Sequence, residues 1–204
     1  MREKGGTALP RTASLFVMPL LALLVGAGPG DDGRWQAGAY SFSDELGGFR
    51  IRNVTGSGTR ADPAILTQEL QTTAPVVLVI RVTGDVPGYA ADERSGEGFL
   101  HMEINTANGS GLAWIEFEFE LQEKLGLPSV YGDGLSFNQR EIGRTDVASS
   151  GFAAYETKFE PYDRLLFQEG KVDPGETVSF RLLITDLTPQ PIFYLVQDPR
   201  IPSS

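Results

Sequence analysis

Residues 112–121 read Leu-Ala-Trp-Ile-Glu-Phe-Glu-Phe-Glu-Leu, and this stretch decides the fold class. From its fourth position onward, apolar and acidic side chains alternate strictly, which is the period of a β-strand with one buried and one solvated face. The pattern exposes Glu116, Glu118 and Glu120 and buries the residues that alternate with them, Ile115, Phe117, Phe119 and Leu121. The stretch therefore predicts a half-buried strand.

Similar runs recur from Tyr40 onward, and none of them shows a convincing helical period. Each run is rich in Val, Ile, Phe and Tyr and is bounded by Gly, Pro, Asn or Asp, which are typical of turns. Short strands at this spacing predict an all-β fold, an Ig-like antiparallel β-sandwich of about 8–10 strands. The expected strands are residues 39–43, 49–55, 64–70, 75–82, 98–105, 112–121, 152–159, 164–167, 177–186 and 191–196.

Residues 99–104 alternate in the same way as residues 112–121, which predicts a hairpin between the two runs. With residues 106–111 as the loop, Asn105 pairs with Leu112. A shift by one residue would place apolar side chains opposite glutamates, so the core pattern favours this register.

Two further stretches refine the sandwich. Residues 75–82 are apolar on both faces, which predicts a central strand covered on both sides. Residues 177–184 alternate at first and then become fully apolar. The preceding Asp173-Pro-Gly-Glu176 predicts a turn, because Pro fixes φ and Gly accepts a positive φ.

The N-terminus has the three parts of a secretory signal peptide. Arg2, Lys4 and Arg11 precede an apolar run over residues 15–25, and small residues follow. The run is shorter than the roughly 20 residues that span a bilayer. We therefore expect cleaved export over residues 1–27; an N-terminal anchor or a buried helix is the alternative.

Export leaves a linker over residues 28–38 and a single domain over residues 39–204. Removing the signal peptide changes the net charge from −10 to −12, because it carries three cations and one acid. The chain has no Cys, so this exported domain relies on its core without disulfides. We expect a secreted or periplasmic protein without a stable membrane span after cleavage.

Composition excludes several classes of function. Without Cys there is no thiol nucleophile and no Cys-ligated metal, and a single His leaves no multi-histidine metal site. The acidic balance argues against nucleic acid and against anionic membranes, since both need clustered Lys and Arg. No Gly-x-Ser-x-Gly motif is present.

The predicted hairpin places His101 opposite Glu116 and Trp114 beside Glu103 on the outer face. His101 with a carboxylate could act as a general base or a pH switch, or simply be a half-exposed strand residue. Trp114 would offer a face for ligand stacking, or pack beneath a loop.

The row Glu116, Glu118 and Glu120 is the most unusual local feature. Alternate strand residues lie about 6.6–6.8 Å apart on one face, so three uncompensated carboxylates repel one another. A Ca²⁺ ion, which takes 6–8 oxygen ligands, would relieve this repulsion. The alternative is a solvated face that blunts sheet pairing.

The loop over residues 129–137 is the best candidate for a binding loop. It carries Tyr131 and Asp133 close together, with a glycine on each side of Asp133, and an aromatic ring beside a carboxylate suits a sugar site. Asp133 could instead join a calcium site, or the loop could be an ordered turn with a buried Tyr131.

Two stretches carry a resemblance to a known group. They are Asn105-x-x-x-Gly109-x-x-x-Ala113-Trp114-x-x-Phe117-x-x-x-Leu121 and Asp173-Pro-Gly-Glu-Thr-Val-x-Phe180. With them the chain resembles uncharacterised small exported bacterial β-sandwich proteins, some of which carry sorting tails of the PEP-CTERM kind. This chain lacks such a tail. The resemblance implies export and a sandwich, and it implies no chemistry.

Three functions follow, in order of preference. The first is an exported non-catalytic binding or surface/matrix-associated protein with an unknown protein or carbohydrate ligand. The second is a calcium-dependent carbohydrate-binding or adhesive module. The third is a carboxylate-based hydrolase, which needs two acids roughly 5–10 Å apart, a spacing that so many acids satisfy by chance.

Overall fold

The computed structural model describes residue 1 and residues 28–84, 98–130, 132–137, 146–158, 162–188 and 190–202. These residues form thirteen β-strands and no helix. The strands are β1 (Trp35–Ala37), β2 (Tyr40–Ser43), β3 (Phe49–Thr55), β4 (Ala64–Leu70), β5 (Val76–Val82), β6 (Gly98–Asn108), β7 (Glu116–Gln122), β8 (Leu135–Phe137), β9 (Ala148–Ser149), β10 (Phe152–Lys158), β11 (Arg164–Gly170), β12 (Thr177–Asp186) and β13 (Ile192–Arg200).

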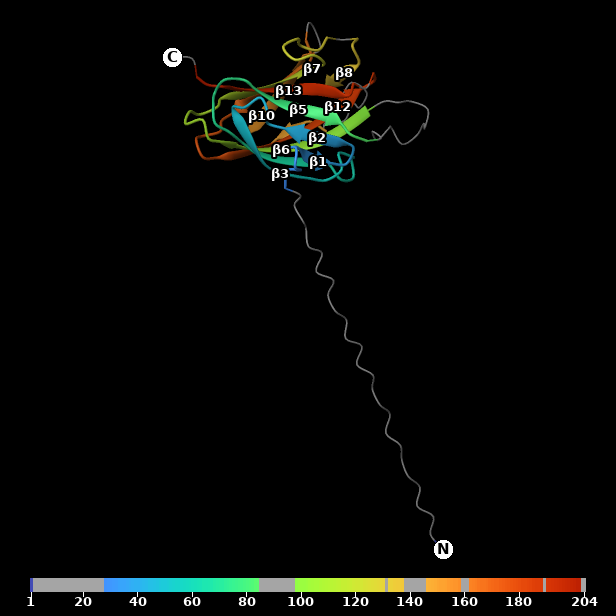
Figure 1. The fold of residues 1–204 in the computed structure, drawn as a ribbon. Coiled ribbons are helices and arrows are strands. Elements are labelled where there is room, and N and C mark those ends of the chain that lie inside the picture. Colours follow the sequence, from blue (N-terminus) through green and yellow to red (C-terminus); the bar gives the residue numbers. More distant parts are fainter. Residues whose placement is uncertain are drawn as a thin grey trace.

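The strands form two sheets that pack face to face as a β-sandwich (Figure 1). Sheet A has the order β1-β2-β5-β13-β7-β11-β10. Sheet B has the order β3-β4-β6-β12-β8, and β9 pairs with the same edge of β12 as β8. All pairs are antiparallel except β4 with β6. In the chain, β5 follows β4 and precedes β6, but it lies in sheet A. The chain therefore crosses from sheet B to sheet A and back, and β6 runs in the same direction as β4.

The core between the sheets follows from the period-two pattern. Phe117 and Phe119 of β7 and Phe167 of β11 surround Phe180 of β12, with ring centroids 4.7, 5.1 and 5.0 Å from that of Phe180. Such aromatic pairs contribute about 0.5–1.5 kcal/mol each beyond the area they bury. This aromatic cluster joins sheet A to sheet B.

A pair of buried amides crosses the same core. Gln68 of β4 and Gln197 of β13 exchange two hydrogen bonds, with N···O distances of 2.5 and 3.2 Å, and Gln68 also donates to Thr106. Both glutamines are at most 1% exposed. Because each amide satisfies the other, this pair fixes the position of one sheet on the other without leaving an unpaired polar group.

The expected strands have counterparts in the structure, but the predicted hairpin is wrong. β6 lies in sheet B between β4 and β12, whereas β7 lies in sheet A between β13 and β11. Both strands bury one face in the same core, so their alternation fixes the buried face and leaves the partner strand open. The predicted pairing of Asn105 with Leu112 therefore does not form.

Other details agree with the sequence. β5 lies between β2 and β13, and Leu78, Val79 and Ile80 are buried in it. In the predicted turn, the Glu176 N–H donates to the Asp173 carbonyl at 3.0 Å, and Gly175 has a φ of 85°. The central strand and the turn are thus confirmed.

The structure adds three short strands, β1, β8 and β9, to those expected. β1 falls within residues 28–38, which were expected to form a linker, and Trp35 packs against the core. The predicted signal peptide lies in residues 1–27, of which 2–27 are outside the described residues, so it stays a prediction.

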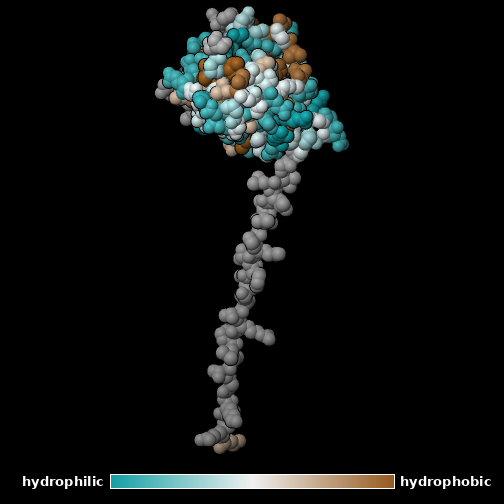
Figure 2. All heavy atoms as spheres, turned by 90° about the vertical axis from the view of Figure 1, so that its left-hand side faces the viewer, coloured by the Kyte–Doolittle hydropathy of each residue, from teal (hydrophilic) through white to brown (hydrophobic). Residues whose placement is uncertain are grey.

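The face of the molecule in Figure 2 is mostly hydrophilic, with separate apolar groups. Scattered apolar residues of this kind are ordinary for a folded protein. Among the described residues, no helix has the length and apolarity needed to cross a membrane.

Candidate functional site

The acidic row of β7 lies on the outer face of sheet A. Glu118 and Glu120 are only 7% and 9% exposed, so their predicted exposure is wrong. Arg164 of β11 binds Glu120 at 2.5 Å and lies 3.7 Å from Glu118, and Arg200 of β13 binds Glu118 at 2.8 Å. The strands on either side of β7 thus place a guanidinium beside each carboxylate, which was not apparent from β7 alone.

These ion pairs remove the premise of the calcium prediction for two of its three residues. Glu118 and Glu120 are charge-compensated, while Glu116 is half-buried at the start of the strand. Among the described residues, no group of three or more His, Asp or Glu side chains is arranged to hold a metal ion. Calcium binding itself stays a prediction.

Trp114 does not lie on the outer face as predicted. Its side chain is fully buried, its Nε1–H donates to the Ser110 Oγ at 3.0 Å, and its ring packs edge-on against Phe117. Its backbone forms a bridge with Val172 where the chain crosses from sheet B to sheet A. Trp114 is therefore a core residue and offers no face for stacking.

The loop between β7 and β8 contains two predicted binding residues. Tyr131 lies outside the described residues. The Asp133 carboxylate accepts hydrogen bonds from the Ser129 hydroxyl at 2.6 Å and from the Val130 and Leu135 N–H groups at 2.9 and 3.0 Å. Asp133 thus holds its own loop together, in the manner of an Asx turn.

Asp163, just before β11, was not recognised from the sequence. It is fully buried, and its Oδ1 accepts a hydrogen bond from the Ser136 hydroxyl at 3.1 Å. Within the described part of the chain, its Oδ2 has no hydrogen-bond partner. Burial, aided by the charge of Asp133, raises the pKa of Asp163 to about 7, against the hydrogen bonds from Ser136 and the Phe137 backbone.

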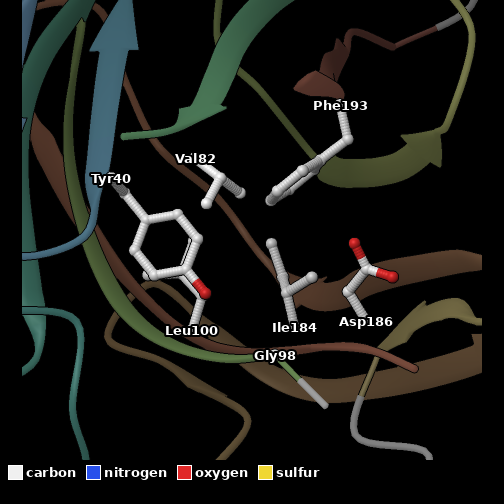
Figure 3. Close-up of a pocket in the computed structure, with 7 residues that line it drawn as sticks. All are labelled: Tyr40, Val82, Gly98, Leu100, Ile184, Asp186 and Phe193. Carbon is white, nitrogen blue, oxygen red and sulfur yellow. The ribbon is translucent and has the colours of Figure 1, made fainter. Parts of the chain in front are cut away.

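A small cavity of about 10 Å³ lies between the sheets near Tyr40 of β2 and Asp186 of β12. Figure 3 shows that these are the two polar side chains among its lining residues. Burial is the main cause that raises the pKa of both, and Asp186 adds to the effect on Tyr40. This volume is about that of one water molecule, so the cavity is too small for an organic ligand.

A larger hollow of about 240 Å³ lies on the outer face of sheet B. We call it the His101 hollow. His101 and Glu103 come from β6, where they face outward because the even-numbered residues of that strand face the core. Its lining residues are Arg60, Pro63, His101, Met102, Glu103, Asp146, Arg181 and Leu182.

An ion pair closes one side of the His101 hollow. The Arg60 Nη2 contacts both carboxylate oxygens of Asp146, at 3.3 and 3.2 Å. Arg60 precedes β4 and lies near β6, because the carbonyl of nearby Gly58 accepts the His101 N–H at 2.9 Å. Asp146 precedes β9, which pairs with the other edge of β12. The pair therefore reaches across β6 and β12.

His101 was predicted to lie opposite Glu116, and this is wrong, since its partner in the sheet register is Leu183. The histidine is half-buried, and this burial lowers its pKa, as does the charge of Arg60, while Asp146 opposes the shift. A neutral imidazole offers one hydrogen-bond donor and one acceptor. His101 can therefore donate a hydrogen bond to the oxygen of a hydroxyl group or accept one from its hydrogen.

Arg181 of β12 provides the least committed group of the hollow. It is exposed and lies opposite Glu103 in the β6–β12 register. In the described ranges, its guanidinium has no hydrogen bond or ion pair. No local motif marks Arg181, Arg60 or Asp146, because only the pairing of β12 with β6 and β9 brings them to His101.

Comparison with protein-family models, with curated proteins and with solved structures found no match.

Proposed function

We propose that this protein is an exported, non-catalytic binding protein that holds a neutral, hydroxyl-rich ligand, such as a saccharide, in the His101 hollow. The observation that carries the proposal is the uncommitted Arg181 guanidinium beside Glu103 and His101 in one solvent-open hollow. The proposal of export rests on the N-terminal sequence pattern. We also propose that the fold is of the Ig-like type, and the two packed sheets support this.

The charge balance of the hollow favours a neutral ligand. Arg60 and Arg181 are matched by Asp146 and Glu103, and the chain as a whole has a net charge of −10. An anionic ligand would be repelled by the protein at long range. A sugar hydroxyl both donates and accepts, so it can donate to Glu103 while it accepts from Arg181.

The lining also favours binding over hydrolysis. The eight described lining residues include no Ser, Thr or Tyr that could serve as a nucleophile beside His101. A carboxylate mechanism would need one free acid and one free base. Asp146 is held by Arg60, so the hollow keeps only Glu103 for such work.

The experiment is an NMR titration of residues 28–204, the chain expected after export, with glucose, galactose and mannose at tens of millimolar. We expect shifts of the His101, Glu103 and Arg181 resonances with at least one sugar. The Arg181→Ala variant should lose them, because its guanidinium is a direct ligand.

The matched control is Arg50→Ala, which removes an exposed arginine from the edge strand β3 of the same sheet. This variant should bind as the unmodified protein does. Absence of any Arg181-dependent shift with all three sugars would overturn the proposed function.

A further inference from the structure

A second hollow lies farther along β12. It has a volume of about 380 Å³ and is open to solvent. We call it the Thr177 hollow. Its lining residues are Ser150, Gly151, Lys171, Val172, Glu176, Thr177 and Val178. Lys171, Glu176 and Thr177 are exposed, so the hollow carries charged groups of both signs and a hydroxyl, as the His101 hollow carries charged groups of both signs. Lys171 also contacts the Asp173 carboxylate and Glu176 accepts the Asp173 N–H, both at 2.8 Å, which leaves Thr177 as the least committed of the three.

Each hollow has a lining residue on the outward face of β12. Thr177 and Arg181 are four residues apart on β12, and residues an even number apart point to the same side of a strand. At about 3.3 Å per residue, this separates them by about 13 Å. The spacing exceeds one sugar ring and fits a short linear chain.

The outward residues of β12 and β6 between the two hollows have short polar side chains. Ser179 is the outward residue of β12 between Thr177 and Arg181, and its hydroxyl donates to Asn105 of β6 at 2.5 Å. Neither side chain is large or apolar, so none stands between the two hollows as a barrier. Across the sheet, the same register continues from Asn105 to Thr67 and Asn53, which extends the strip of amides and hydroxyls.

The pairing of β12 argues against an extended peptide as the ligand at this strand. A peptide binds a sheet by adding a strand to an open edge. β12 is paired with β6 along its whole length, and on its other side with β9 at Phe180 and Arg181 and with β8 from Ile184 to Asp186, so the edge beside Arg181 is occupied. Recognition along β12 must use outward side chains, which suits the hydroxyls of a saccharide.

We propose that the His101 and Thr177 hollows are two subsites for one extended, neutral oligosaccharide that lies along β12 over Ser179. This inference rests on the proposed function, because it takes the His101 hollow as the first subsite. It adds a preference for length and shape. A straight chain follows a strand better than a curved one does.

The test is isothermal titration calorimetry with glucose, cellobiose and cellotetraose, and with maltotetraose as the curved chain of equal size. We expect cellotetraose to bind about tenfold or more tightly than glucose, because the second contact becomes intramolecular once the first has formed. Maltotetraose should gain less over glucose than cellotetraose does.

The decisive variant is the double substitution Lys171→Met and Thr177→Val, which removes the ammonium and the Thr177 hydroxyl from the Thr177 hollow while it keeps side-chain size. Both residues are exposed, so the variant should melt as the unmodified protein does. It should lower the affinity for cellotetraose to about that for glucose and leave glucose binding unchanged. Arg181→Ala should weaken both.

The outcomes separate the two proposals. If glucose binds through Arg181 but cellotetraose gains nothing, or if the double variant binds it normally, the two-subsite inference fails and the proposed function stands. If neither sugar binds in an Arg181-dependent way, the proposed function fails and the inference fails with it.

Discussion

Two of the regions that bury acidic side chains do so in different ways. On the outer face of sheet A, Glu118 and Glu120 each contact a guanidinium from a neighbouring strand. Asp163, just before β11, is buried more deeply, and among the described residues its donors are the Ser136 hydroxyl and a backbone amide. A buried carboxylate is either paired with a cation or kept neutral by a proton.

Asp163 connects several elements of the fold through its backbone and its side chain. Its backbone N–H donates to Ser129 at 3.1 Å, and its carbonyl accepts from Leu121 at 3.2 Å. Its side chain accepts from Ser136 of β8, which belongs to sheet B, while Leu121 belongs to sheet A. Asp163 therefore ties together two sheets and the loop between them, and its charge state bears on that joint.

The largest effect we predict is a loss of stability as the pH rises. The pKa of Asp163 is about 7 in the folded protein and near 3.8 when unfolded, so between these values the folded state alone keeps the proton. The free energy of unfolding should fall from about pH 4 to pH 7 by up to about 4 kcal/mol. Asp186 and Asp198, whose pKa values burial also raises, act in the same direction.

Urea denaturation across this pH range checks the prediction. The Asp163→Asn variant mimics the neutral acid and should remove most of the slope. A slope that survives in Asp163→Asn unchanged would show that the proton sits elsewhere, and Asp186→Asn would then locate it.

The second-largest loss of stability is predicted for the buried pair Gln68 and Gln197, which is polar but carries no charge. Replacing Gln68 by Ala leaves the Gln197 amide buried without its partner and opens a cavity, at a cost of about 3 kcal/mol. The double variant Gln68→Leu and Gln197→Leu removes both polar groups and should cost far less than the single change. Chemical denaturation of the two variants measures this, and equal losses would contradict mutual satisfaction.

Removing Arg164 should leave Glu120 buried without a cation beside it, as Asp163 is. The Arg164→Ala variant leaves Glu120 without a cation and should lose about 2–3 kcal/mol, less than a fully buried pair because Arg164 is partly exposed. Urea denaturation of the variant at one pH measures this loss, and an unchanged free energy of unfolding would show that Arg164 does not compensate Glu120.

The same contrast shows what the sequence could predict. Alternation in residues 112–121 correctly gave the buried positions of Phe117 and Phe119, because burial of one strand face is a local property of the pattern. It could not show that Arg164 and Arg200 flank Glu118, because they arrive from strands far along the chain. The hairpin failed for that reason, as did the exposure of Trp114, since both depended on the choice of neighbouring strand.

The candidate site follows the same rule. His101 was identified as a candidate because it is the sole histidine, yet its surroundings were assigned to the wrong strand. Arg181 and Asp146 reach it through the pairing of β12 with β6 and β9, which no spacing in the sequence reveals. A residue type can thus be identified from the sequence, whereas its charge environment depends on strand order.

The smallest effect on stability is expected at Arg181, and it sharpens the contrast between the two sheet faces. Arg164 and Arg181 are both outward arginines, but only Arg164 compensates buried carboxylates. Because Arg181 is exposed and has no partner among the described residues, Arg181→Ala should change the free energy of unfolding by less than about 0.5 kcal/mol. Thermal melts of Arg181→Ala and Arg164→Ala side by side measure this.

A large loss in Arg181→Ala would mean that the guanidinium stabilises the fold, and an arginine that stabilises the fold is a poor candidate for a ligand contact. An unchanged melt together with lost sugar binding would place its contribution in recognition.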